Sequence, residues 1–135
     1  MADVTVKRIE EMDSIFDGLM VRARAELGVS AFGMQVMNLP PNWTDYPEHT
    51  HAGIGANDGQ EEVYVPLAGR ATLVAGEERF DLEPGVIARV GPGQLRKIVT
   101  GAEPMRILAI GGMPGKAYDA PPFTEVGAPA PAVSV

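Results

Sequence analysis

The sequence has 135 residues, a net charge of −7 and no cysteine, which fits a single domain and excludes disulfides, thiolate metal sites and a cysteine nucleophile. The acidic balance argues against nucleic acid and against an anionic membrane surface as partners, because both require clustered lysine and arginine. The N-terminus lacks the apolar run of a signal peptide and no window is apolar enough to cross a bilayer, so we expect a soluble, cytoplasmic protein.

Residues 1–30 are expected to form an N-terminal extension of helix and strand. Residues 8–16 place apolar side chains at helical spacing, which predicts one short helix. After the turn pair Asp17-Gly18, residues 19–27 alternate between apolar and charged side chains, which predicts a half-exposed strand, although the helix propensity of the same stretch favours a helix. The charged positions of this stretch are expected to form a solvated face: Arg22, Arg24 and Glu26.

Residues 31–117 consist of short apolar runs separated by glycine and proline turns. Strands are predicted over residues 32–39, 61–67, 71–74, 78–82, 86–90, 95–99 and 105–112. Ala75-Gly76-Glu77 is predicted to be a hairpin turn, and Glu83-Pro84-Gly85 has the pattern of a type II turn. Many short strands with little helix predict an all-β fold, either an antiparallel sandwich or a small barrel. Residues 118–135 are rich in proline and alanine, and we expect a tail that is mobile or lies over the surface.

The only two histidines, His49 and His51, are separated by one residue. On a strand, such residues point to the same face. Imidazole and carboxylate ligands together suit zinc, iron, manganese, nickel or copper. On the later predicted strand, Glu62 and Tyr64 share one face with Gln60, whereas Glu61 lies on the other face.

This pattern resembles the first motif of the cupin superfamily, in which His-x-His is followed by a short spacer, Glu, six residues and Gly. His49 and His51 match it, and the six residues between Glu62 and Gly69 select Glu62 rather than Glu61 as the ligand. The second motif of the family, Gly-x5-Pro-x-Gly-x2-His, aligns with residues 85–96. The resemblance covers residues 35–112 and implies a cupin-type antiparallel β-barrel or jelly roll, commonly assembled as a homodimer.

The sequence departs from the family motifs in three places. The spacer between His51 and Glu62 is ten residues long, and we expect it to form a loop beside the barrel mouth. Gly91 stands where the second motif has its proline. The fourth ligand, a histidine in metal-binding cupins, is replaced by Arg96, which stays protonated and has no lone pair to donate to a metal.

Three interpretations of Arg96 follow. In the first, which we favour, His49, His51 and Glu62 hold a metal and Arg96 orients an anionic substrate. In the second, Arg96 pairs with Glu62 and takes the place of the metal. In the third, Arg96 points outward and the histidines are ordinary core groups.

The function hypothesis is a small cupin that binds a divalent transition metal, one of iron, manganese, zinc, nickel or copper. It would act on a small anionic molecule as a dioxygenase-, isomerase- or hydrolase-like metalloenzyme. Arg96 and Tyr64 are the predicted catalytic groups. Gln60 is expected to contact the metal ligands, and not the metal itself, and so to orient them. The alternative is a non-catalytic cupin that binds a small molecule, with or without a metal. In its metal-free form, Arg96 is paired to Glu62.

Overall fold

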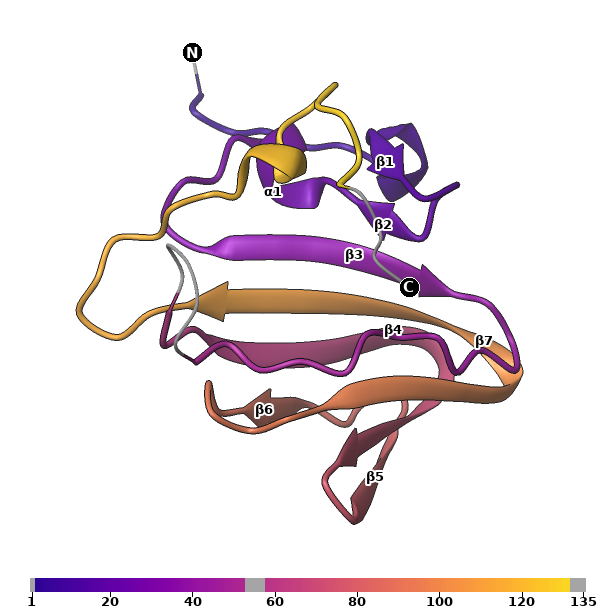
Figure 1. The fold of residues 1–135 in the computed structure, drawn as a ribbon. Coiled ribbons are helices and arrows are strands. Elements are labelled where there is room, and N and C mark those ends of the chain that lie inside the picture. Colours follow the sequence, from indigo (N-terminus) through magenta and orange to yellow (C-terminus); the bar gives the residue numbers. More distant parts are fainter. Residues whose placement is uncertain (1, 53–57, 132–135) are drawn as a thin grey trace.

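The computed structural model describes residues 2–52 and 58–131, which form a largely antiparallel β structure with little helix. Figure 1 shows the arrangement of its elements. The strands are β1 (Ser14–Ile15), β2 (Met20–Val21), β3 (Gly33–Leu39), β4 (Glu61–Ala75), β5 (Glu78–Leu82), β6 (Ala88–Val90) and β7 (Lys97–Gly112). The helical segments are the 3-10 turns η1 (Ile9–Glu11) and η2 (Pro122–Thr124) and the α-helix α1 (Ala23–Leu27). No helix in these ranges is long and apolar enough to cross a membrane.

The strands form one antiparallel sheet in the order β1-β2-β3-β7-β4-β5, with β6 paired to β4. β7 is the central strand, because it pairs with β3 along one side and with β4 along the other. The all-β class and the antiparallel barrel are therefore confirmed. The hairpin turn at Gly76 and the turn at Glu83-Pro84-Gly85 are also confirmed, the latter by a hydrogen bond from Val86 N to Glu83 O of 3.0 Å.

β4 and β7 are each continuous, whereas the sequence predicted each as two shorter strands. The β4–β7 register shifts between Pro66 and Ala68 and again between Gly69 and Ala71, so irregular pairing replaces the predicted breaks. Gly69 has a positive φ of 83°, and a Cβ at this position would collide with the carbonyl oxygen of Pro104. The motif glycine therefore allows two backbones to approach closely at a bend in the sheet.

The sheet separates two apolar layers. The larger layer fills the barrel and includes Tyr64, Ile98 and Ile107, which are fully buried. The smaller layer, around Val21 and Val36, lies on the other face. Figure 1 shows α1, β1, β2 and the C-terminal segment gathered on one side of β3, and β5 and β6 on the opposite side of the molecule.

The N-terminal extension differs from the prediction. A helix over residues 8–16 is wrong, because only η1 is helical there and β1 follows it. The short α-helix lies instead at Ala23–Leu27, where the helix propensity of residues 19–27 is confirmed over their alternating pattern. Only β2 is extended in this stretch. Phe16 and Asp17 both have φ of 55° and form, with Gly18, the turn between β1 and β2. The chain is already extended at Met12 and pairs with β2 from Ser14, so strand pairing replaces the predicted helix.

The predicted solvated face is also wrong. The exposed fractions of Arg22 and Arg24 are only 2% and 6%. Arg22 donates to Asp13 Oδ2 at 2.7 Å and to the carbonyl oxygens of Phe123 at 3.0 Å and Ala128 at 2.5 Å. The arginines are buried because the C-terminal segment lies across them and supplies acceptors for their guanidinium groups.

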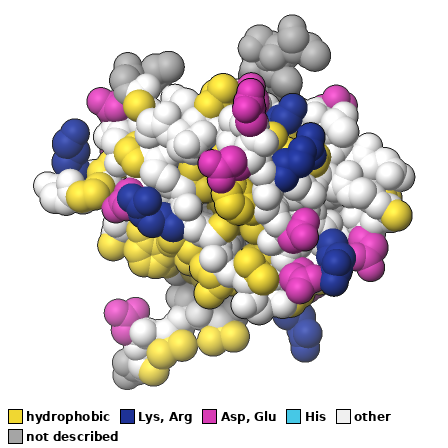
Figure 2. Space-filling model, turned by 90° about the horizontal axis from the view of Figure 1, so that it is seen from below, with side chains coloured by type: hydrophobic (Ala, Val, Ile, Leu, Met, Phe, Trp, Pro, Cys, Tyr) yellow, Lys and Arg dark blue, Asp and Glu magenta, His cyan; other side chains and the backbone are white. Residues whose placement is uncertain are grey.

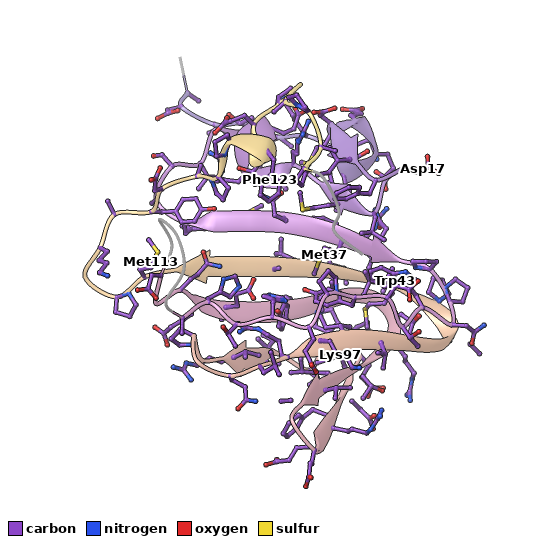
Figure 3. All side chains as sticks on the ribbon, in the orientation of Figure 1. Asp17, Met37, Trp43, Lys97, Met113 and Phe123 are labelled. Carbon is purple, nitrogen blue, oxygen red and sulfur yellow. The ribbon has the colours of Figure 1, made fainter. Side chains whose placement is uncertain are left out.

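The C-terminal segment lies over the molecule as far as Ala128, whose carbonyl oxygen accepts from Arg22. Figure 3 shows Phe123 on the α1 side of β3, whereas Met37 lies on the side facing β7. The Tyr118 ring packs on Gly33, where a Cβ would lie 2.8 Å from the phenol oxygen. Tyr118 and Phe123 thus lie against the rest of the molecule, and residues 132–135 lie outside the described chain.

Several large hydrophobic side chains remain exposed. On the side of β5 they include Phe80 at 46% and Ile87 at 67%. Figure 2, which views the molecule from this side, shows hydrophobic side chains on the surface, bordered by charged ones. The N-terminal segment adds Val4 at 71% and Val6 at 86%.

Candidate metal centre

The candidate centre joins the start of β4 to the segment that follows β3. Glu62 and Tyr64 alternate along β4 and face the interior, where the small residues Gly111 and Ala109 lie opposite them on β7. His49 forms an antiparallel bridge with Arg96, made of two backbone hydrogen bonds of 3.0 Å each. This bridge fixes the histidine segment beside the residues that precede β7.

The two imidazoles converge on one carboxylate oxygen. His51 Nε2 lies 2.9 Å and His49 Nε2 lies 3.8 Å from Oε1 of Glu62. The three potential ligand atoms all lie within 4.8 Å of one another. The structure therefore brings together the three residues that the sequence selected as metal ligands.

The His49 ring is held by its neighbours in the chain. Its Nδ1 lies 2.9 Å from the carbonyl oxygen of Pro47, and its ring stacks against Tyr46 with centroids 5.8 Å apart. An Nδ1–H that donates to this carbonyl leaves the lone pair of Nε2 directed at the site. The Trp43 ring packs edge-on against the Tyr46 ring.

Arg96 points inward and contacts Glu62. Its Nη2 donates to Glu62 Oε1 at 3.2 Å, and its Nη1 donates to the carbonyl oxygen of Gln94 at 2.8 Å. The side chain is fully buried, and its Nε has no hydrogen-bond partner. The interpretation in which Arg96 faces outward is therefore wrong, and the direct pair with Glu62 of the second interpretation is present.

Burial, with a smaller contribution from the charge of Glu62, keeps the tyrosines around this carboxylate protonated. Burial alone would raise the pKa of Glu62, but the hydrogen-bonding groups of His49, His51 and Tyr64 outweigh it and hold this pKa well below its usual range. Burial and then the charge of Glu62 raise the pKa of Tyr46 to about 12. Burial, followed by the neighbouring Tyr46 and Glu62, also raises the pKa of Tyr64. Tyr64 is thus a neutral phenol that donates to Glu62 Oε1 at 2.8 Å.

The donor set fits a divalent transition metal. Two ligand atoms at ordinary zinc distances are separated by about 3.4 Å in a tetrahedral site, and the 2.9 Å and 3.8 Å separations lie on either side of this value. The side chains of His49 and His51 are 31% and 24% exposed, so the histidine side of the site is open to solvent. A cluster that could hold a metal ion is therefore present.

Gln60 is the residue that was expected to orient the metal ligands. Gln60 is buried and packs against Gly111, where a Cβ would lie 2.5 Å from the Gln60 side-chain nitrogen. Its support of the metal ligands stays a prediction. Half of the predicted ten-residue loop beside the barrel mouth, residues 53–57, lies outside the described residues.

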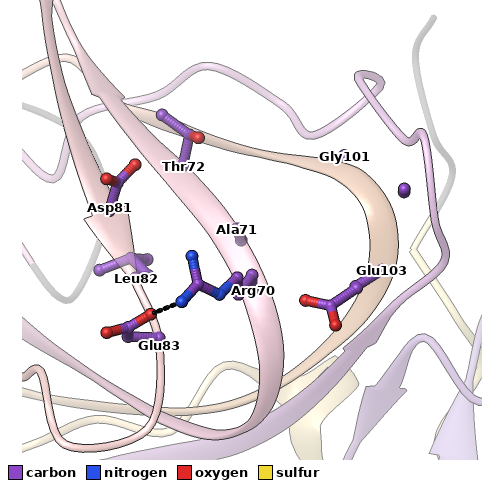
Figure 4. Close-up of a pocket in the computed structure, with 9 residues that line it drawn as sticks. Arg70, Ala71, Thr72, Asp81, Leu82, Glu83, Gly101 and Glu103 are labelled. Carbon is purple, nitrogen blue, oxygen red and sulfur yellow. Dashed lines mark ion pairs between the residues drawn. The ribbon is translucent and has the colours of Figure 1, made fainter.

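Two surface cavities lie away from this centre. The first, of about 290 Å³, lies between β4, β5 and the middle of β7, and Figure 4 shows Arg70 paired with Glu83 at 2.6 Å across it. The second, of about 510 Å³, adjoins Leu39 and Met105. None of the predicted site residues lines either cavity.

Sequence reasoning missed two backbone groups of the centre. The carbonyl oxygen of Pro47 receives the His49 contact, and that of Gln94 receives the Arg96 guanidinium. A backbone carbonyl has no side-chain signature, so no residue type in the sequence indicates either contact. Tyr46, whose ring stacks against His49, was not among the predicted site residues.

Comparisons with known proteins identify the fold. No protein-family model and no curated protein matches the sequence significantly. Among solved structures, a cupin protein from Bacteroides fragilis is similar with a TM-score of 0.66 and 18% identity, over 90% of this chain and 93% of that one. A sugar phosphate isomerase of the cupin superfamily, from Silicibacter pomeroyi, is similar with a TM-score of 0.63 and 20% identity, over 79% of this chain and 74% of that one.

A third similar structure is a DMSP lyase from Ruegeria pomeroyi, with a TM-score of 0.53 and 23% identity over 71% of this chain and 45% of that one. These identities are low, so the likeness concerns the fold, and the same fold carries different activities in these proteins. With its antiparallel barrel and its His49-His51-Glu62 cluster, the chain has the cupin fold.

Proposed function

We propose that the protein binds a divalent transition metal through His49, His51 and Glu62 and acts on a small anionic molecule. The observation that carries the proposal is the convergence of the three ligand atoms within 4.8 Å, with His49 oriented by the Pro47 carbonyl. A bound metal would supply Lewis-acid or dioxygen chemistry. The cupin-fold isomerase and lyase are compatible with an enzyme, and the reaction class proposed here is oxygenation, isomerisation or hydrolysis.

The charge of the site favours an anion as its ligand. Glu62 and Arg96 cancel each other, so a divalent ion between neutral histidines leaves two uncompensated positive charges. A ligand that brings negative charge compensates them. The histidine side is the accessible side, whereas Arg96 is fully buried, so the ligand would approach past the imidazoles.

The chain's own residues have separate roles in this proposal. The Tyr64 hydroxyl and the Arg96 guanidinium both donate to Glu62 Oε1 and hold the carboxylate in place. Tyr64 stays protonated at neutral pH, so it acts as a donor and not as a base. Arg96 is a positioning residue that acts through Glu62, because its buried guanidinium does not reach solvent.

Metal content tests the proposal. The untagged protein, supplemented separately with iron, manganese, zinc, nickel and copper in a buffer that contains acetate as an anionic ligand, should retain about one equivalent of a preferred metal, as expected for three protein ligands. His49→Ala and Glu62→Ala should lose it, because each removes a ligand. Glu61→Ala is the matched control, since Glu61 lies on the other face of β4 and pairs with Arg89. Equal, negligible metal in all four proteins would refute metal binding.

The alternative is a metal-free cupin that binds a small molecule without catalysis. The contact between Arg96 and Glu62 favours it, because a buried arginine already neutralises the carboxylate. The metal titration separates the two functions: a folded protein without affinity for any of these metals supports the alternative.

We also propose a homodimer in the cytoplasm. Residues 2–8 are exposed and belong to no strand, yet Val4 and Val6 alternate with polar residues as in a half-buried strand. Pairing with a second copy would cover both valines and complete a sheet edge. Light scattering should give twice the monomer mass, and deletion of residues 1–7 should give a folded monomer. A monomeric full-length protein at high micromolar concentration would contradict this assembly.

A further inference from the structure

The position of Arg96 is fixed by three hydrogen bonds that do not involve Glu62. Its backbone N–H and C=O both pair with His49, and its Nη1 donates to the Gln94 carbonyl. The guanidinium therefore stays beside Glu62 Oε1 even when the carboxylate takes another partner.

A metal at the three-residue cluster must then share Glu62 with a permanent cation. Oε1 is the oxygen that lies near both histidines and also accepts from Arg96. Arginine does not deprotonate at any ordinary pH, and like charges at such short range repel strongly in a partly buried site. The repulsion is relieved only when negative charge enters from the accessible histidine side.

We propose that Arg96 makes metal binding at this site weak and dependent on an anion, so that a divalent metal and a small carboxylate-like anion bind cooperatively. The inference rests on the proposed metal function and adds its regulation. The coupling is reciprocal, because the anion that tightens metal binding is itself bound more tightly when the metal is present. Arg96 thereby restricts the loaded site to conditions in which an anionic ligand is present.

Cobalt affinity tests the inference without an activity assay. Isothermal titration with Co²⁺ is performed at constant pH and ionic strength in sodium perchlorate and in sodium acetate, with correction for cobalt–acetate complexes in solution. The wild-type protein should bind Co²⁺ about tenfold or more tightly in acetate, since the anion offsets the charge of Arg96 and the metal. The visible spectrum of bound Co²⁺ should change when acetate is added.

Two substitutions assign the effect to the charge of Arg96. Arg96→Gln removes the charge but keeps a hydrogen-bond donor, and should tighten Co²⁺ binding in perchlorate by about tenfold or more while reducing the acetate effect. Arg96→Lys keeps the charge and should behave as wild type. Circular dichroism and thermal melting verify that both variants are folded, and the wild-type comparison of the two salts remains decisive if either is not.

The outcomes are distinct. Tight Co²⁺ binding by the wild type in perchlorate, unchanged by acetate, would overturn the inference and leave the metal function intact. Equal affinities of Arg96→Gln and Arg96→Lys would likewise overturn it, because charge would then not be the cause. Absence of Co²⁺ binding by all three proteins in both salts would overturn the inference together with the metal function.

Discussion

Gly69 shows how a single residue positions the candidate site. It lies seven residues after Glu62 on β4, at the second register shift against β7. Its positive φ and the nearby Pro104 carbonyl leave no room for a Cβ. The bend that it permits follows directly on the part of β4 that carries Glu62 and Tyr64.

Gly69→Ala should therefore destabilise the protein by about 3 kcal/mol, because an L-residue at this φ is strained and the Pro104 backbone must also move. Urea unfolding measures the change. Gly101→Ala is the matched control on β7, since a methyl group at Gly101 would meet open space and the φ of this residue is not positive. A loss below about 1 kcal/mol for Gly69→Ala would show that the sheet relaxes around the methyl group.

The site residues differ in how far the sequence determines them. His49, His51 and Glu62 could be selected because strand periodicity and motif spacing place ligand-type side chains together. The orientation of the Arg96 side chain could not be predicted, because the sequence was compatible with an inward and an outward arginine. The backbone bridge to His49 decides it, and such pairing between distant segments has no local sequence signal.

At the scale of elements, turns were easier to predict than strand ends. Gly76 and Gly85 adopt the positive φ that the turn patterns require, so these turns are encoded locally. The breaks predicted within β4 and β7 were wrong because a register shift accommodates Gly69 and Gly101-Ala102-Glu103-Pro104 without ending the strands. Long-range pairing overrides the local turn signal in these strands.

The N-terminal extension was least predictable, because its structure depends on the C-terminal segment. Arg22 looked like a surface residue in an alternating pattern. It is buried only because Phe123 and Ala128, about a hundred positions later, bring carbonyl oxygens to its guanidinium. Periodicity within a short window contains no information on such a partner.

Arg22→Met should destabilise the protein by about 3 kcal/mol, because it removes one of the donors to Asp13 and the guanidinium donors to two carbonyl oxygens. Thermal or urea unfolding measures the loss. Arg79→Met is the matched control, since Arg79 is exposed on β5 and its replacement should change stability by less than about 0.5 kcal/mol. Equal effects of the two substitutions would mean that the buried hydrogen bonds of Arg22 contribute nothing net.

At the scale of the whole molecule, the two ends of the chain cover the smaller apolar layer around Val21 and Val36, which is the outer layer of the sheet. Asp13 is one of the points where they meet, because its Oδ2 accepts from Arg22 Nη1 at 2.7 Å and from the Gly127 backbone N–H at 2.9 Å. The barrel core and the candidate site lie on the other face of the sheet. Release of the tail should therefore expose the outer layer and leave the site in place.

Acid should release the tail. The Gly127 N–H and then the Arg22 guanidinium lower the pKa of Asp13. A carboxyl whose folded pKa lies below its unfolded value contributes stability that is fully present above the unfolded pKa, about 4 for aspartate, and is lost as the pH falls through the folded pKa. Hydrogen exchange, corrected for intrinsic rates, should therefore show falling protection of residues 123–128 below about pH 4.

Asp13→Asn should show reduced protection of these residues already at neutral pH and a flatter dependence on acid, because the amide carries no titrating charge. Asp17→Asn is the control: Asp17 points into solvent in Figure 3, and asparagine tolerates its positive φ. In Asp17→Asn, the protection of residues 123–128 should depend on pH as it does in the wild type. If protection of residues 123–128 is lost in acid to the same extent in all three proteins, a carboxylate other than Asp13 governs the docking of the tail.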